Sequence, residues 1–260
     1  MGFRLILCGV VACAVGGFAA GPAQAQSDVV SAAVSGLPTF GPAIVPAAQV
    51  PLEQVPAEVR DRIRGVLERP TLRTQGPAEV FSCQPAFYLW LLDHPDLAVR
   101  LWRALGVQCA DIQDRREGRF SWQDGQGSDV NWTAVLRGPG QRVWYAEGRV
   151  KPGVLLPAVA VRAVVCLNHR EAKDTASRPV VRHQVELHLQ TDSRAIALAA
   201  RLLGASIPRL AEQYAGQIQT FYAALAWYCD QNPEKARSLL SSLEMGPRRS
   251  ERLDVSPRRR

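Results

Sequence analysis

Residues 129–151, DVNWTAVLRGPGQRVWYAEGRVK, decide the fold class of this chain. Apolar and polar side chains alternate through 129–137, and one face of that run is formed by Val130, Trp132, Ala134 and Leu136. Gly138-Pro139-Gly140 then predicts a turn, and a second strand-like run follows from Arg142 to Lys151. Two extended runs joined by a Gly-containing turn predict an antiparallel β-hairpin.

Further strand-like stretches lie on both sides of this hairpin. They are Thr71–Gln84 with a break at Gly76-Pro77, Cys109–Arg115, Arg119–Asp124, Val159–Arg170 and Pro179–Thr191. Short stretches of this kind, separated by turn residues, predict an antiparallel meander.

Helical periodicity occurs before, within and after the meander. One helix is expected over Glu58–Glu68, and two short ones begin at Pro85 and Pro95. A further run extends from Asp192 to Leu203. The longest helix begins at Ser206, and its apolar residues recur every three or four positions: Ile207, Leu210, Tyr214, Ile218, Phe221, Leu225 and Tyr228. At ~1.5 Å per residue it is long enough to cross a sheet.

The order of elements predicts an α+β domain. We expect a curved antiparallel sheet of about seven strands wrapped on a long C-terminal helix. This order resembles the helix-grip fold of the START-like or SRPBCC superfamily over roughly residues 70–232. The resemblance is one of topology, without a signature motif. It implies an elongated apolar cavity for lipids, sterols or aromatic polyketides, and it carries over no catalytic residue. A cystatin-like or nuclear-transport-factor-like sheet is the alternative, although such folds place their main helix near the start.

The N-terminus predicts export. Residues 1–25 combine Arg4, an apolar run and Ala23-Gln24-Ala25, which is the pattern of a cleaved secretory signal. We therefore expect a periplasmic or secreted protein. An uncleaved anchor and a lipoprotein signal at Cys13 are the alternatives. The segments that follow are a Pro/Ala-rich linker (26–56), the START-like domain (57–232) and a basic disordered tail (233–260).

The basic character of the chain is concentrated in that tail. Of the net charge of +7, residues 248–260 hold a surplus of four and Arg4 holds one, so the rest keeps only +2. We therefore expect no nucleic-acid partner for the folded part. The tail either contacts an anionic surface or is simply solvated, and the residues available for contact are Arg248, Arg249, Arg258, Arg259 and Arg260.

Aromatic side chains supply the predicted binding site. An apolar pocket is typically walled by aromatic rings with a few polar groups. The candidate ligand-binding residues are Trp122, Trp132, Trp144, His183, Tyr214 and Phe221. The alternative is that these rings fill the core.

The sequence contains few candidate catalytic residues. His183 lies on the apolar face of its strand, and Glu147 lies within an aromatic strand, so each is a candidate for proton transfer. Glu147 is an ordinary surface charge if it points outward, and Arg162 is a possible partner for a ligand carboxylate. His188 is expected to be exposed, and His94 and His169 to be cap or loop residues. No metal or cofactor site is predicted.

Four cysteines remain after the predicted cleavage, and none has the C-x-x-C spacing of a zinc knuckle. They form either two disulfides of undetermined pairing or buried free thiols. They are Cys83, Cys109, Cys166 and Cys229.

These observations favour an exported binding protein for a hydrophobic small molecule or lipid held in an interior cavity. One alternative is a cyclase- or dehydratase-type enzyme that uses the same cavity. The other is a structural or interaction protein of the cell envelope that acts through its basic tail.

Overall fold

A computed structural model describes residues 49–107, 109–125, 127–151, 158–191 and 206–244. In the first turns of the long helix that begins at Ser206, only the backbone is described up to residue 214, apart from the side chain of Glu212. The predicted signal, the helix expected over 192–203 and the arginines of the tail lie outside these ranges. Among the described residues, no helix is long and apolar enough to cross a membrane.

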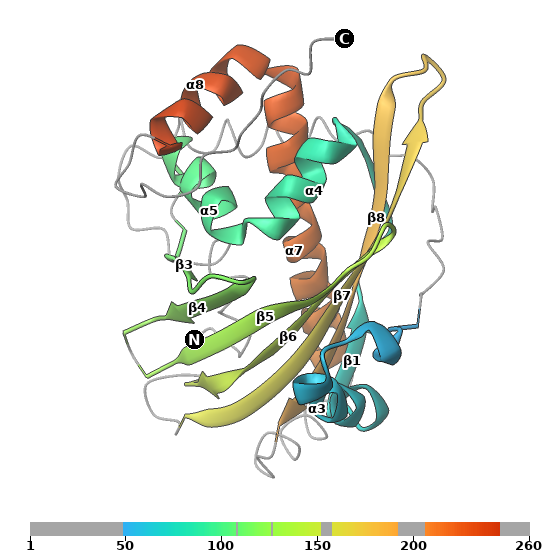
Figure 1. The fold of residues 1–260 in the computed structure, drawn as a ribbon, viewed down its shortest axis with the longest axis vertical. Coiled ribbons are helices and arrows are strands. Elements are labelled where there is room, and N and C mark those ends of the chain that lie inside the picture. The colour runs from blue at the N-terminus through green and yellow to red at the C-terminus, as the bar shows by residue number, and fades with distance from the viewer. Residues whose placement is uncertain (1–48, 108, 126, 152–157, 192–205, 245–260) are drawn as a thin grey trace.

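Eight antiparallel strands form one curved sheet in the described part of the chain (Figure 1). Their order is β1-β8-β7-β6-β5-β4-β3, and β2 pairs with β8 after β1 ends. The bounds are β1 Leu72–Gln75, β2 Glu79–Ser82, β3 Gln113–Asp114, β4 Arg119–Gln123, β5 Asp129–Arg137, β6 Gln141–Val150, β7 Val159–Lys173 and β8 Pro179–Thr191.

Helices cover both faces of this sheet. The helices are η1 Leu52–Gln54, α3 Ala57–Glu68, α4 Pro85–Asp93, α5 Pro95–Ala104, α7 Ser206–Gln231 and α8 Pro233–Glu244. The inner face is the one on which α4 and α7 pack, and β8 contributes Val185 and Leu187 to its core. The outer face is covered by α3, whose Ile63 and Val66 belong to a second apolar cluster with residues of β5, β6 and β7.

The buried side chain of Gln219 holds α7 against the sheet. Its Oε1 accepts a hydrogen bond of 3.0 Å from the Val185 amide, and its Nε2 donates to the Pro77 carbonyl. This position lies where Gly76-Pro77 separates β1 from β2. A Cβ atom on Gly76 would stand 2.0 Å from Gln219 Oε1, so only glycine allows the helix to approach so closely.

The predicted α+β fold is confirmed, with eight strands and a C-terminal helix packed on the sheet. The hairpin strand over 129–137 and the strand over 179–191 have the predicted bounds. The stretch over 109–115 contains only the two-residue β3, because few of its residues pair with β4.

Two structural features differ from the expected ends of the domain. The chain does not leave the fold at Pro233, because Pro233 is the first residue of α8, a position that proline favours. Apolar residues then recur along α8, and it packs on α5 and α7 through Ala236 and its partly buried leucines. Val55, which falls within the predicted linker, is buried under α3 with 1% of its surface exposed.

Replacing Gln219 with leucine tests how α7 is held. The change leaves the Val185 amide and the Pro77 carbonyl buried without partners, so we expect the free energy of unfolding to fall by about 2–4 kcal/mol. Chemical denaturation measures it. Gln217→Leu is the matched control, because its half-buried side chain lies two residues away and its Oε1 has no hydrogen-bond partner among the described residues; it should cost less than about 1 kcal/mol. Equal losses for the two variants would contradict this role.

Candidate functional site

A line of polar groups crosses the inner face of the sheet beneath α4. His183 of β8 is fully buried, and its Nδ1 lies 2.6 Å from the Tyr88 hydroxyl. Its Nε2 lies 3.0 Å from Glu79 Oε2. When Tyr88 donates to Nδ1, His183 carries its proton on Nε2 and donates it to Glu79. The edges of the Phe81 and Tyr88 rings meet the imidazole, so apolar groups enclose the line.

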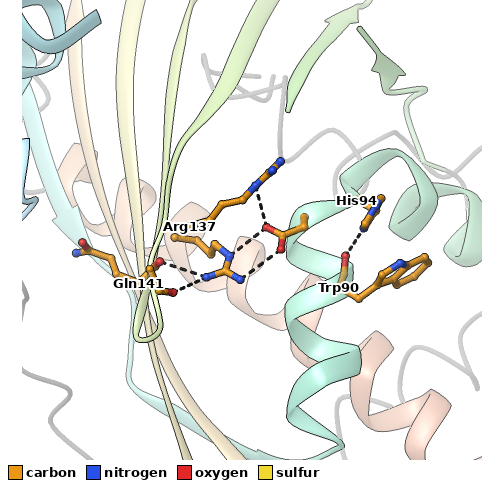
Figure 2. Close-up of polar contacts among 7 residues, drawn as sticks. Trp90, His94, Arg137 and Gln141 are labelled. Atoms are coloured by element: carbon orange, nitrogen blue, oxygen red, sulfur yellow. Dashed lines mark hydrogen bonds and ion pairs between the residues drawn. The ribbon is translucent and has the colours of Figure 1, made fainter. Parts of the chain in front are cut away.

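A second set of polar side chains, from His169, Arg142, Asp93 and Arg137, lies beside this line. His169 is the partner of His183 in the register of β7 and β8, and its ring is 6.5 Å from that of Tyr88. The guanidinium of Arg142 donates to both carboxylate oxygens of Asp93 at 3.0 and 3.3 Å, and Arg137 bonds the same carboxylate at 3.3 Å (Figure 2). This bidentate pair ties α4 to the β5–β6 hairpin.

Burial shifts the pKa values of Tyr88 and His169. It raises the pKa of Tyr88 well above its usual range, so the phenol keeps its proton. Burial, with the positive charge of Arg142 as the next cause, lowers the pKa of His169 from 6.5 to about 4. His169 is therefore neutral at physiological pH, and its Nε2 has no hydrogen-bond partner among the described residues.

Three of the predicted binding residues form an aromatic wall on the neighbouring strands. Trp122, Trp132 and Trp144 come from β4, β5 and β6, and each is less than 9% exposed on the inner face. The Trp132 ring stacks on Phe120 at 5.8 Å. The indole Nε1 of Trp122 is buried and has no acceptor among the described residues. This wall therefore contains one unused hydrogen-bond donor.

Among the other predicted residues, Phe221 packs on a helix instead of on this wall. Phe221 contacts Trp102 of α5, whose indole donates to the Phe221 carbonyl at 3.1 Å, so its ring packs between helices. Tyr214 lies on α7, but its side chain is outside the described part. Glu147 lies on the outer face, where it bonds Arg62 and the Tyr145 hydroxyl.

An open groove of about 730 Å³ lies at the end of the sheet. It is bounded by residues 49–54, the 138–141 turn and residues 168–171. The Asn168 side chain lines it, with 1% exposure and an Nδ2 that has no partner among the described residues. This groove is a surface feature and differs from the interior cavity that the sequence predicts.

Two expectations for histidines are corrected. His188 is 6% exposed rather than solvated, because α3 packs over β7 and β8 on the outer face. Its Nε2 lies 2.9 Å from Glu186 Oε1, and together with Arg73 it holds the pKa of Glu186 below its usual range. His169 is a buried residue of β7 rather than a loop residue, because β7 extends to Lys173.

The four cysteines are free and buried rather than bridged. Burial raises the pKa of the Cys166 and Cys229 thiols to about 12. Such thiols are poor nucleophiles. No group of three His, Cys, Asp or Glu side chains that could hold a metal ion occurs within the described ranges.

Sequence analysis identified His183 but not the partners that make the site. Glu79 and Tyr88 come from distant elements, and no spacing in the sequence connects them to His183. The inward position of Arg142 and His169 could have been predicted from the sequence. Alternation along β6 and β7 places them on the inner face with Trp144 and Leu167.

The buried state of His169 predicts that acid destabilises the protein. Between pH 6.5 and about 4 the unfolded chain binds a proton that the folded chain does not, so stability falls as the pH falls through this window. His169→Phe should flatten that part of the stability profile, whereas His94→Phe, on a half-buried cap residue, should not. Denaturation across the pH range measures the slope. An NMR titration showing His169 near its usual pKa would contradict the prediction.

Comparison with known proteins assigns no family. No family model and no curated protein matches this chain. Among solved structures, a conserved protein from Geobacillus kaustophilus is 12% identical, with a TM-score of 0.38 over 58% of this chain and 95% of that one. A hypothetical protein from Helicobacter pylori is 11% identical, with a TM-score of 0.39 over 72% and 98%. The di-domain ARO/CYC protein StfQ of the steffimycin biosynthetic pathway is 14% identical, with a TM-score of 0.34 over 69% and 57%.

Proposed function

We propose that this domain binds a hydrophobic small molecule or lipid against the inner face of the sheet, and that an oxygen of the ligand accepts a hydrogen bond from Trp122. The proposal rests mainly on the Trp122 Nε1 atom, which is buried without an acceptor among the described residues. Leaving a buried donor unpaired costs about 1–3 kcal/mol, so an acceptor at this position would be stabilising.

The position of α7 supports the proposal that a ligand binds over the aromatic wall, because α7 packs mainly on other strands. The main contacts of α7 with the sheet are to β1, β2 and β8. Strand β5 is three places from β8, or roughly 14 Å at ~4.8 Å per strand. A helix is only about 10–12 Å wide with its side chains. The wall formed by Trp122, Trp132 and Trp144 therefore needs other apolar partners, and we infer that a ligand is one of them.

The proposed ligand is apolar with few polar groups. The inner-face core around the wall contains aliphatic and aromatic residues, including Val130, Ala146 and Val165. Polar groups are concentrated in the line beneath α4, where His183 is already bonded to Tyr88 and Glu79. A ligand with a long apolar body and one oxygen-bearing end matches this distribution.

The sequence supports two further parts of the proposal. The signal-like residues 1–25 support action in the periplasm or outside the cell. The order of strands before a long C-terminal helix supports membership of the START-like superfamily. In this role the protein would act as a carrier or sensor without covalent chemistry.

Native mass spectrometry of protein purified without detergent tests the binding function. We expect a bound mass that leaves on denaturation, and uptake of a fluorescent fatty acid by the emptied protein. Trp122→Phe keeps an aromatic ring but deletes the N–H group, so it should weaken fatty-acid binding about fivefold to tenfold.

Trp90→Phe is the matched control, because Trp90 lies on α4, where its ring stacks on His94. It should leave binding unchanged. A clean apo mass with no probe uptake would refute the binding function. Unchanged binding in Trp122→Phe would refute only the role of the N–H group.

A second candidate is a cyclase- or dehydratase-type enzyme, favoured by the placement of His183 between a phenol and a carboxylate. Here His183 Nδ1, once released by the Tyr88 hydroxyl, would take the proton next to a ligand carbonyl and return it to the β-hydroxyl, which then leaves as water. Glu147 has no part in it, because it faces the other side of the sheet. We expect Glu79→Gln to abolish dehydration of a bound β-hydroxy ketone while affinity is retained. Loss of binding and turnover together would argue for a positioning role alone.

A further inference from the structure

A second, polar pocket lies on the outer face, away from the proposed ligand space. It has a volume of about 420 Å³, many times the ~30 Å³ that one water occupies. Residues of α3, its C-terminal end, β7 and β8 line it: Asp61, Arg62, Gly65, Arg69, Arg162 and Gln190.

Positive charge dominates this pocket. The guanidinium groups of Arg69 and Arg162 make no ion pair or hydrogen bond with any described side chain, whereas the carboxylate of Asp61 is neutralised by Arg64. Arg62 bonds both oxygens of Glu147 at 3.1 Å. Two exposed guanidiniums that form no ion pair with a described side chain therefore face one pocket, and an anion between them would reduce their mutual repulsion.

The backbone of α3 leaves room for a ligand. Arg62 lies on α3 and Arg69 is the residue that caps its C-terminal end, and both line the pocket together with Gly65. A Cβ atom on Gly65 would have no neighbour within 4 Å, so the space above it is open. Gln190 Nε2 donates to the carbonyls of Gly65 and Arg69 at 3.3 and 3.2 Å, which offsets the negative end of the helix.

We propose that this pocket is a binding site for a phosphate group, held by Arg162 and Arg69 and, on binding, by Arg62. A carboxylate is satisfied by a single bidentate arginine, whereas a phosphate offers three or four oxygens to several guanidiniums. The volume also accommodates a group esterified to the phosphate. This inference does not depend on the proposed function of the inner face.

Glu147 is the competing anion of this site. It is the partner of Arg162 in the register of β6 and β7, yet it bonds Arg62 and the Tyr145 hydroxyl instead. The Arg62 guanidinium also lies 5.9 Å from the centre of the Tyr145 ring. A phosphate must therefore share Arg62 with Glu147, and removing the Glu147 charge should tighten binding.

Isothermal titration of the purified protein with inorganic phosphate tests the site, with chloride at equal ionic strength as the reference. We expect saturable binding that Arg162→Gln and Arg69→Gln each weaken about tenfold. Glu147→Gln should change affinity in the opposite direction, strengthening it. Because the pocket is open to solvent, added salt should weaken binding.

Arg170→Gln is the matched control. Arg170 lies on β7 eight residues beyond Arg162, is exposed, and its substitution removes the same charge. Three results would overturn the proposal. They are an unchanged phosphate affinity in Arg162→Gln, an equal loss of affinity in Arg170→Gln, and a weaker affinity in Glu147→Gln.

The source of the phosphate is distinguished by a second measurement. Glycerol 3-phosphate and phosphatidylcholine vesicles with or without phosphatidylglycerol are compared as ligands. Binding of glycerol 3-phosphate alone identifies a soluble phosphate ester. Additional binding of the anionic vesicles that is lost in Arg162→Gln identifies a lipid headgroup. Vesicle binding that persists in Arg162→Gln, without phosphate binding in titration, would refute the site.

Discussion

The Gln219 side chain is the constraint on which the arrangement of the domain depends. It supplies hydrogen bonds to backbone groups at the break between β1 and β2, where strand pairing alone leaves the Val185 amide and the Pro77 carbonyl unmatched. The same break lets β2 resume pairing with β8 so that Glu79 stands opposite His183. Through this contact, the position of α7 and the assembly of the inner polar line are set together.

The position of α7 divides the inner face into chemically distinct parts. Near β8 and α4, buried polar groups satisfy one another through Tyr88, His183 and Glu79. Across β4 to β6, the surface is aromatic, and the Trp122 indole N–H has no acceptor within the described part of the chain. A buried polar network that is satisfied internally is more consistent with holding the fold in one arrangement, whereas the unused donor is better suited to contacting a ligand.

Local patterns predicted the elements well, because alternation and helical periodicity report which face of an element is buried. Alternation over 129–137 and 179–191 specified two strands, and Gly76-Pro77 correctly indicated a break. The same patterns could not show that α3 covers the outer face, so His188 was wrongly expected to be exposed. They also could not bring Glu79, Tyr88 and His183 together, since that contact depends on how α4 packs. Pro233 was ambiguous because proline both ends and begins helices.

Strand β7 gives the sheet one half that is much harder to open than the other. It pairs along its length with β6 and β8 and is buried on both faces from Ala163 to His169. At the far edge, β3 contributes only two exposed residues, paired with β4. Local opening follows buried area and pairing, so the β3–β4 edge should exchange its amide protons long before β7 does. Local opening should therefore begin beside the aromatic side of the sheet, while the half that holds α7 stays closed.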